Sequence, residues 1–318
     1  MSAPGPLEPS GSPRVRSLTQ DRLSHCVTHG TSFFNSHSER MFYLIISTFS
    51  YLWSATAIDA IAELADNGYK TFEVPISSPH CWPDEISSSE RSAISARLNA
   101  YGAKIRSLNA GGYDINLASP GANMRLKSIE HIKSVIDLAV AWDVPEVVIS
   151  PGTRRPMISP SLEKAYGWMY ERLENLIPLA KQAGTRLLLE NTPYCFTPTI
   201  RDLAGIVSAV NDDVLKIVWD VANAAYIGED PVAGLLSNHK SIALVHISDT
   251  GLETWGHDPI GTGVVDFNGL GDAVEATCGV SNVVLEIIRE ENPLYEFNKA
   301  MHDLRNKGWK SLSQECAR

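Results

Sequence analysis

The sequence of 318 residues contains only five cysteines, and no two of them form a CxxC pair. An odd number of scattered thiols is typical of reduced cysteines, and it argues against a disulfide framework or a zinc site built from sulfur ligands. The cysteine pattern therefore predicts a cytoplasmic protein. None of the five cysteines is assigned a catalytic role.

Basic charge is also scarce, because 27 lysines and arginines stand against 37 aspartates and glutamates, which gives a net charge of -10. Nucleic acids and anionic membranes select proteins with a basic face. Long hydrophobic runs are absent too, and the stretch FYLII, Phe42 to Ile46, is far too short to span a bilayer. The sequence therefore predicts no nucleic-acid partner and no membrane association.

The first forty residues carry few large apolar side chains and are rich in serine, proline and glycine. Such a segment cannot bury enough apolar surface to fold by itself, and it lacks the continuous apolar stretch of a secretory signal. We therefore expect residues 1–40 to form a flexible N-terminal tail.

From Met41 onward, short apolar runs alternate with longer amphipathic segments. Strands that alternate with helices pair in parallel through crossovers, and parallel strands covered on both faces are continuous runs of Val, Ile and Leu. Eight such units predict a single-domain α/β protein, a (β/α)8 TIM barrel over residues 41–310, followed by a C-terminal tail of residues 311–318. The expected strands are Phe42–Ser47, Lys70–Pro75, Lys104–Ala110, Glu146–Gly152, Arg186–Pro193, Lys216–Asp220, Ile242–Thr250 and Asn282–Ile288.

An open, doubly wound sheet is the alternative architecture with the same alternation. Its first strand is normally followed by a glycine-rich turn that binds phosphate. The residues after Ser47 are TFSYLWSATA and contain no glycine. The barrel is therefore the preferred interpretation.

Four of the later strands end in a charged or imidazole side chain, namely Glu190, Asp220, His246 and Glu286. The carboxyl ends of barrel strands meet at one mouth, where the active sites of such barrels lie. Carboxylates placed together there repel one another unless a cation lies between them. One imidazole with three carboxylates suits one divalent metal ion, best Mn²⁺, and tolerates Mg²⁺, Co²⁺, Fe²⁺ or Zn²⁺. Each residue alone could instead be a helix cap or a surface ion pair, but their order on consecutive strands favours the metal.

The same segments resemble the xylose-isomerase-like superfamily of sugar isomerases and epimerases, over Met41 to about Lys310. The resemblance rests on LLLEN at Leu187–Asn191, WDVANA, VHISDT, the loop GTGVVDF at Gly261–Phe267, VVLEI, and NLASPG with the arginine that follows it. It implies that the four strand-end residues bind the metal, and that Glu190 and Glu286 double as acid and base on opposite faces of the substrate. The implied activity is isomerisation or epimerisation of a keto-sugar or inosose, by abstraction of the proton beside the carbonyl through a metal-stabilised enediolate.

The sequence departs from the pattern of this superfamily at two places. Asn223 stands where many relatives have a histidine, and no arginine follows His246 within SDTGLETWGHDPIG. The first departure, with the acidic charge, argues against a nuclease resembling endonuclease IV, and the second implies different substrate contacts. A lyase of the same superfamily is therefore an alternative, either a keto-inositol dehydratase or an enzyme of 3-keto-glycoside or C-glycoside β-elimination. A non-catalytic binding barrel or subunit is a further alternative.

Loop residues near the expected mouth are further candidates. His257, in WGHDPIG, is an expected auxiliary acid, or a residue that anchors a turn. His80, Trp82, Asn223 and Arg154 are expected substrate contacts, with an exposed loop histidine and a solvated arginine as the alternatives for His80 and Arg154. The expected partner is a small-molecule carbohydrate, and a homo-oligomer or a partner subunit is left open.

Overall fold

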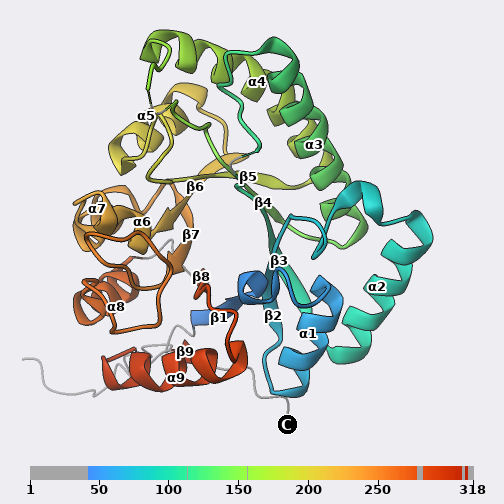
Figure 1. Ribbon diagram of the computed structural model, residues 1–318, viewed down its shortest axis with the longest axis vertical. Helices are drawn as coiled ribbons and strands as arrows, with labels where there is room; N and C mark the ends of the chain where they lie inside the picture. The colour runs from blue at the N-terminus through green and yellow to red at the C-terminus, as the bar shows by residue number, and fades with distance from the viewer. Residues whose placement is uncertain (1–41, 113, 156, 278–281, 310–311, 314–318) are drawn as a thin grey trace, which may run out of the picture. The chain divides into compact units, whose positions relative to one another are not determined.

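The computed structural model describes residues 42–112, 114–155, 157–277, 282–309 and 312–313. The expected tail of residues 1–40 lies outside these ranges, as does most of the expected C-terminal tail. Within the described residues, eight parallel strands form a closed ring, and the helices lie around the outside of this ring (Figure 1). The structure is therefore the predicted (β/α)8 TIM barrel.

The ring closes because the first and the eighth strand pair with each other. Leu44 of the first strand lies opposite Val283 of the eighth, and Ser47 lies opposite Glu73 of the second strand. The barrel strands are β1 (Phe42–Ser47), β2 (Thr71–Pro75), β3 (Lys104–Ala110), β4 (Glu146–Ile149), β5 (Arg186–Glu190), β6 (Leu215–Asp220), β7 (Ile242–Ile247) and β8 (Asn282–Leu285).

The core has one layer inside the barrel and a second layer between the strands and the helices. The inner layer consists of the buried side chains Ile45, Val148, Leu188, Val218, Ala243, Leu244 and Val284. The outer layer joins the remaining strand residues to the apolar faces of the helices, and Phe72, Trp219 and Phe267 are among its fully buried side chains. Burial on both faces explains why the strands are continuous apolar runs.

Local signals in the sequence set several helix ends. Ser87 and Glu90 form a capping box at the start of α2, and Gly102 ends this helix in the left-handed conformation, with φ of 61°. The helices are η1 (Thr48–Tyr51), α1 (Ala57–Asp66), η2 (Pro83–Glu85), α2 (Ser88–Tyr101), α3 (Ala122–Ala141), α4 (Leu162–Ala183), α5 (Ile200–Val210), α6 (Val221–Tyr226), α7 (Pro231–Asn238), α8 (Phe267–Ala276) and α9 (Pro293–Asn306). Within the described ranges, no helix combines the length and the apolar character needed to cross a bilayer.

Several features differ from the expectations drawn from the sequence. Strands β5, β7 and β8 end at Glu190, Ile247 and Leu285 rather than at Pro193, Thr250 and Ile288. Helix α6 follows β6 without a connecting loop, because Asp220 is both the last residue of the strand and the N-cap of the helix. The fourth strand ends at Ile149 rather than Gly152, since Pro151 lacks an N–H group and Gly152 has φ of 130°. Residues Leu312–Ser313, which were expected in a tail, form a short strand, β9, that pairs with the first residues of β1.

Candidate active site at the barrel mouth

Four side chains meet where the barrel strands end. They are Glu190 at the end of β5, Asp220 at the end of β6, His246 in β7 and Glu286 directly after β8. One ligand atom from each lies within 4.8 Å of the others, and all four residues are buried. The Nδ1 atom of His246 is 3.1 Å from Glu286 Oε2, 3.6 Å from Glu190 Oε1 and 3.9 Å from Asp220 Oδ2. The structure thus brings together the four residues expected to bind metal.

Hydrogen bonds fix Asp220 within this cluster. Its N–H donates to Asn191 Oδ1 at 2.7 Å and its carbonyl oxygen accepts from Asn191 Nδ2 at 2.8 Å, which joins the ends of β5 and β6. Its Oδ1 accepts the N–H of Asn223 at 2.6 Å as the cap of α6. Its Oδ2 is buried and has no hydrogen-bond partner among the described residues. A buried oxygen without a partner is costly, and a cation in the cluster would satisfy it.

His246 is held on its other side by Glu73, a residue that the strand-end pattern did not single out. Glu73 Oε2 lies 3.1 Å from His246 Nε2, and both side chains are fully buried. Ser107 Oγ donates to the same carboxylate oxygen at 2.7 Å, and Asn109 Nδ2 donates to the other at 3.4 Å. With Nε2 bonded to a carboxylate, Nδ1 is the nitrogen that faces the cluster. A charged residue within the apolar strand TFEVP was the signal for it in the sequence.

Burial and the crowding of charges shift the proton equilibria of the cluster. Burial raises the pKa of Asp220 to about 7, a shift that His257 opposes and that Glu286 and Glu190 reinforce. Burial likewise raises the pKa of Glu286 to about 7, although His246 opposes this shift. Burial alone would lower the pKa of His246, but Glu73 and Glu286 hold it well above its usual value. Without a cation the cluster therefore retains protons that a bound metal would replace.

The donor set of the cluster fits a divalent cation. Three carboxylates and one imidazole nitrogen form a set of mostly oxygen ligands, and the unpartnered Oδ2 of Asp220 and the Nδ1 of His246 lie within it. Such a set accepts Mn²⁺, Mg²⁺, Co²⁺, Fe²⁺ and Zn²⁺. The cluster could therefore hold a metal, and its ligands do not select one ion among these.

A cavity of ≈ 330 Å³ opens beside the cluster. Of the four cluster residues, Glu190 and Glu286 line this cavity, whereas Asp220 and His246 are fully buried behind it. The expected site residues Trp82, Asn223 and His257 also line it. Two carboxylates therefore reach the space that a small ligand would occupy, and they do so from different strands.

His257 lies between the cavity and the cluster. Its Nδ1 is 3.3 Å from Glu286 Oε2, 3.6 Å from Asp220 Oδ2 and 3.1 Å from Ser248 Oγ. Its carbonyl oxygen accepts the N–H of Ile288 at 2.9 Å, which ties its loop to the residues after β8. The imidazole therefore lies within reach of Glu286 and of the cavity.

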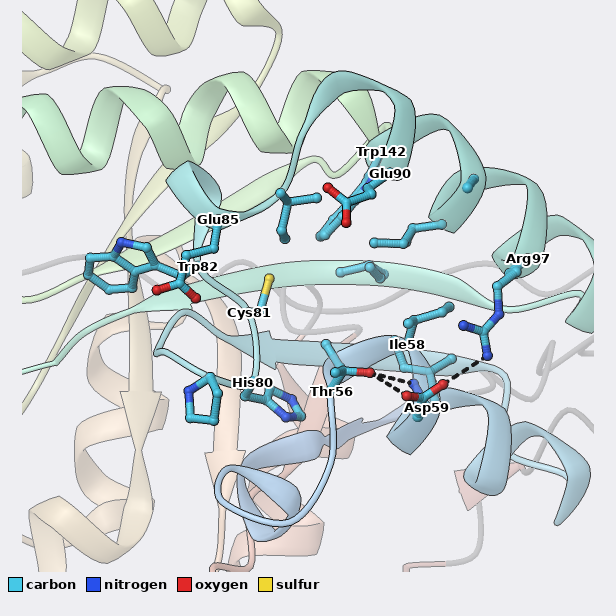
Figure 2. Close-up of a pocket in the computed structure, with 17 residues that line it drawn as sticks. Thr56, Ile58, Asp59, His80, Cys81, Trp82, Glu85, Glu90, Arg97 and Trp142 are labelled. Carbon is cyan, nitrogen blue, oxygen red and sulfur yellow. Dashed lines mark hydrogen bonds and ion pairs between the residues drawn. The ribbon is translucent and has the colours of Figure 1, made fainter.

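His80 and Arg154 do not line this cavity, contrary to the expectation that both contact the substrate. His80 is 3% exposed, and its ring nitrogens lie 2.8 Å from Thr48 Oγ1 and 2.7 Å from the Ala55 carbonyl oxygen. It therefore links the loop after β2 to the segment between β1 and α1. It also borders a separate cavity next to α1 and α2 (Figure 2). Arg154 is exposed and contacts Ser159 Oγ at 3.4 Å, so it is a surface residue.

Asp249 organises the long loop between β7 and α8, which carries His257. Its carboxylate accepts the N–H groups of Gly261, Gly263 and Val265 at 2.9, 2.8 and 3.1 Å. A Cβ atom at Gly263 would lie 2.1 Å from the Thr250 carbonyl oxygen, so the loop approaches too closely there for any other residue. The glycines of GTGVVDF thus serve the loop geometry, and Asp249 was not singled out from the sequence because its partners are backbone groups.

A family model described as a xylose isomerase-like TIM barrel matches residues 61–307. The chain belongs to this family. An uncharacterized protein of Methanocaldococcus jannaschii is 25% identical over 159 residues, which are 49% of this chain and 60% of that protein. The chain thus spans less than two thirds of the length of this relative.

Solved structures share the barrel of this xylose isomerase-like protein. A D-tagatose 3-epimerase-like protein superposes with a TM-score of 0.72 at 20% identity, over 85% of this chain and 98% of that chain. The 3-keto-D-glucoside 4-epimerase YcjR from E. coli has a TM-score of 0.70 at 19% identity, with 83% and 98% covered. The IolI protein with a bound zinc atom has a TM-score of 0.68 at 19% identity, with 87% and 100% covered. At these identities the likeness shows a shared fold.

Proposed function

We propose that this chain is a divalent-metal-dependent isomerase or epimerase of a keto-sugar or an inosose. In this proposal Glu190, Asp220, His246 and Glu286 hold one divalent metal ion, proposed as Mn²⁺ from among the ions that this donor set accepts, and Glu190 and Glu286 also act as acid and base. The names of two proteins of similar fold, a D-tagatose 3-epimerase-like protein and a 3-keto-D-glucoside 4-epimerase, support a carbohydrate substrate.

One observation carries this proposal. Within a cluster of four buried residues from four consecutive strands, only Glu190 and Glu286 line the cavity. A residue that binds metal and also transfers a proton must contact the substrate, whereas a residue that only binds metal need not. The division of the cluster into two members that line the cavity and two that do not matches this difference.

The residues of the chain then have separate tasks. When bound, a divalent ion would polarise the substrate carbonyl and stabilise the negative charge that develops on its oxygen. One of the two glutamates removes the proton from the carbon beside the carbonyl, and the other delivers a proton to the opposite face. Glu73 keeps Nδ1 of His246 directed into the cluster, and Asn191 keeps Asp220 in place.

A lyase of the same superfamily is the second candidate, and the position of His257 favours it. His257 lines the cavity beside Glu286, so a third proton-transferring group is present. In a β-elimination, a glutamate takes the proton beside the carbonyl, the bond to the β substituent breaks, and the leaving oxygen takes a proton from His257. The products would be an unsaturated ketone and either water or a free alcohol, rather than an epimer.

The first test is the metal content of protein purified without chelators or a histidine tag. We expect about one equivalent of a divalent ion per chain, and we expect Asp220→Ala to lose it because the cluster then lacks one of its four ligands. Asp213→Ala, at a fully exposed aspartate of the preceding loop, is the matched control and should keep the ion. Near-zero metal that added cations cannot restore would contradict the proposal and favour a non-catalytic binding barrel.

The second test is the exchange of substrate protons with solvent, measured by NMR in D₂O with a ketohexose and an inosose. Glu286→Gln should slow exchange at the carbon beside the carbonyl by at least about 100-fold, because it removes an acid/base group. Glu290→Gln, at an exposed neighbouring position, should exchange like the wild type. Unchanged exchange in a folded Glu286→Gln protein would rule out the acid/base role, and an unsaturated ketone among the products would identify the lyase.

A further inference from the structure

The charges around the cavity are unsuited to a phosphorylated ligand. Asp114, Glu190 and Glu286 line it, and the described lining residues include no lysine or arginine. A phosphate group is normally held by guanidinium or ammonium groups, and carboxylates at short range repel it. Even with one divalent cation in the cluster, the lining residues and Asp220 would leave the cavity with an excess of negative charge.

The arginines near the mouth do not change this balance. Arg154 is exposed and outside the cavity lining, as described above. Arg289 follows Ile288, which lines the cavity, but its guanidinium is paired with Asp258. A phosphate would therefore have to break an existing ion pair to find a cation here.

Trp255 forms a prearranged apolar surface on the side of the loop between β7 and α8. Its Nε1 donates to Asn223 Oδ1 at 2.7 Å, so the indole is held by a buried side chain. Tyr194 packs edge-on against it at 5.5 Å between ring centroids, and His257 does so at 5.8 Å. Asn223, the residue that departs from the pattern of many relatives, therefore serves to orient an aromatic ring that lines the cavity.

A second apolar surface comes from the loops after β1 and β2. Phe49, Leu52 and Trp82 line the cavity there. Trp82 is stacked on His131 of α3, with 4.3 Å between ring centroids and 24° between the ring planes. Trp82 also borders the other cavity, where in Figure 2 its indole points away from Asp59 and Arg97. Strands β2 and β7 are three steps apart around the barrel, so the two indoles approach the cavity from separate sides.

We propose that the substrate of this site is an uncharged keto-sugar that carries an apolar substituent, such as an aryl or alkyl aglycone, which packs against Trp82 and Trp255. This inference rests on the proposed function for the position of the sugar, whose carbonyl lies beside Glu190 and Glu286. The two indoles are fixed by contacts within the protein, so binding costs them little side-chain freedom. A flat or branched apolar group gains both burial and ring contacts there.

The test uses inert ligands, so that binding is measured apart from turnover. Calorimetry of the metal-loaded full chain compares phenyl β-D-glucoside with methyl β-D-glucoside, and glucose 6-phosphate with glucose. We expect the phenyl glucoside to bind about tenfold more tightly than the methyl glucoside. We expect the phosphate to bind at least about tenfold more weakly than glucose. Equal affinities for the two glucosides, tighter binding of the phosphate, or no binding of the phenyl glucoside would each overturn the inference.

Variants locate the contact. Trp82→Leu and Trp255→Leu should each reduce the ratio of phenyl to methyl affinity several-fold towards one. Trp53→Leu is the matched control, because Trp53 is 64% exposed and does not line the cavity, and it should keep the wild-type ratio. A ratio that survives both substitutions would show that the substituent binds elsewhere and would overturn the proposal.

Failure of this inference and failure of the proposed function give different results. If keto-sugars with and without the apolar substituent show no solvent exchange but the phenyl preference persists and depends on Trp82 or Trp255, the reaction is wrong and the binding inference stands. If exchange is rapid but the two glucosides bind equally, the reaction stands and the apolar substituent is excluded.

Discussion

At the scale of single residues, Glu73 links three strands of the barrel through side-chain contacts. Its carboxylate contacts His246 of β7 and accepts hydrogen bonds from Ser107 and Asn109 of β3. Asn109 also contacts Glu286 Oε1 at 3.5 Å, so the same network reaches two cluster residues. A carboxylate bonded to one nitrogen of a ligating histidine makes the other nitrogen a better ligand.

We expect Glu73→Gln to weaken metal binding by about 10- to 100-fold, because glutamine keeps the shape of the contact but not its charge. Competition with a chromophoric chelator measures this affinity. Nitrogen NMR of His246 in the metal-free protein would report the altered protonation of its ring. Glu253→Gln, at an exposed loop glutamate, is the control, and equal affinities for the two variants would contradict the role of Glu73.

The site residues that the sequence predicted differ in their sequence context from those that it missed or misplaced. Glu190, Asp220, His246 and Glu286 each end an apolar run, so the fold alone implies that they meet. Glu73 lies within β2 rather than at the end of an apolar run, and only the side-chain packing shows that it faces His246. His80 and Arg154 lie in loops, where a sequence indicates neither burial nor direction.

At the scale of elements, the loop between β7 and α8 depends on a single carboxylate. Asp249 accepts N–H groups from Gly261, Gly263 and Val265, and its backbone N–H and carbonyl both bond to Asp258. Because the same loop carries Trp255 and His257, its conformation sets one wall of the cavity. The conformation of the loop is therefore held by hydrogen bonds rather than by regular secondary structure.

We expect Asp249→Asn to destabilise the protein by about 2 to 4 kcal/mol, because one acceptor oxygen becomes an NH₂ group that faces backbone donors. Hydrogen exchange should show lost protection at the amides of Gly261, Gly263 and Val265. Asp272→Asn, at an exposed position of α8, should leave both stability and protection unchanged. Full protection at the three amides in Asp249→Asn would show that the loop holds its shape without this carboxylate.

Helix ends were predictable where a clear capping residue precedes the helix, as with Ser87 at α2. Helix α6 was not, because its cap is Asp220 and the same residue ends a strand. One side chain then has two functions, since its Oδ1 caps the helix and its Oδ2 faces the cluster. A sequence pattern assigns such a residue to one element and misses the other.

At the scale of the whole molecule, the barrel was the most predictable feature. Eight buried strands leave few arrangements in which the backbone N–H and C=O groups of the edge strands are paired, and a closed barrel is one of them. The pairing of β9 with β1 was not predictable, since a strand of two residues has no periodicity. Residues 1–40 contain few large apolar side chains, so the sequence does not predict that they pack against the barrel core.

We propose that residues 1–40 are dispensable for the barrel, since all the described strand pairings involve residues from Phe42 onward. A chain that begins at Met41 should unfold within about 2 °C of the full chain by calorimetry, and it should bind the same amount of metal. A fall of more than about 5 °C, or loss of metal, would show that the tail belongs to the folded unit.

The pairing of β1 with β8 has a consequence for how the protein is made. Ser50, next to β1, donates to the carbonyl oxygen of Ile287, a residue 237 positions later. When the first seven strands have emerged from the ribosome, three of the four cluster residues are present. The sheet then still has two unpaired edges, and such edges tend to pair with other chains. The site and the protection against aggregation are thus completed together, when Glu286 leaves the ribosome.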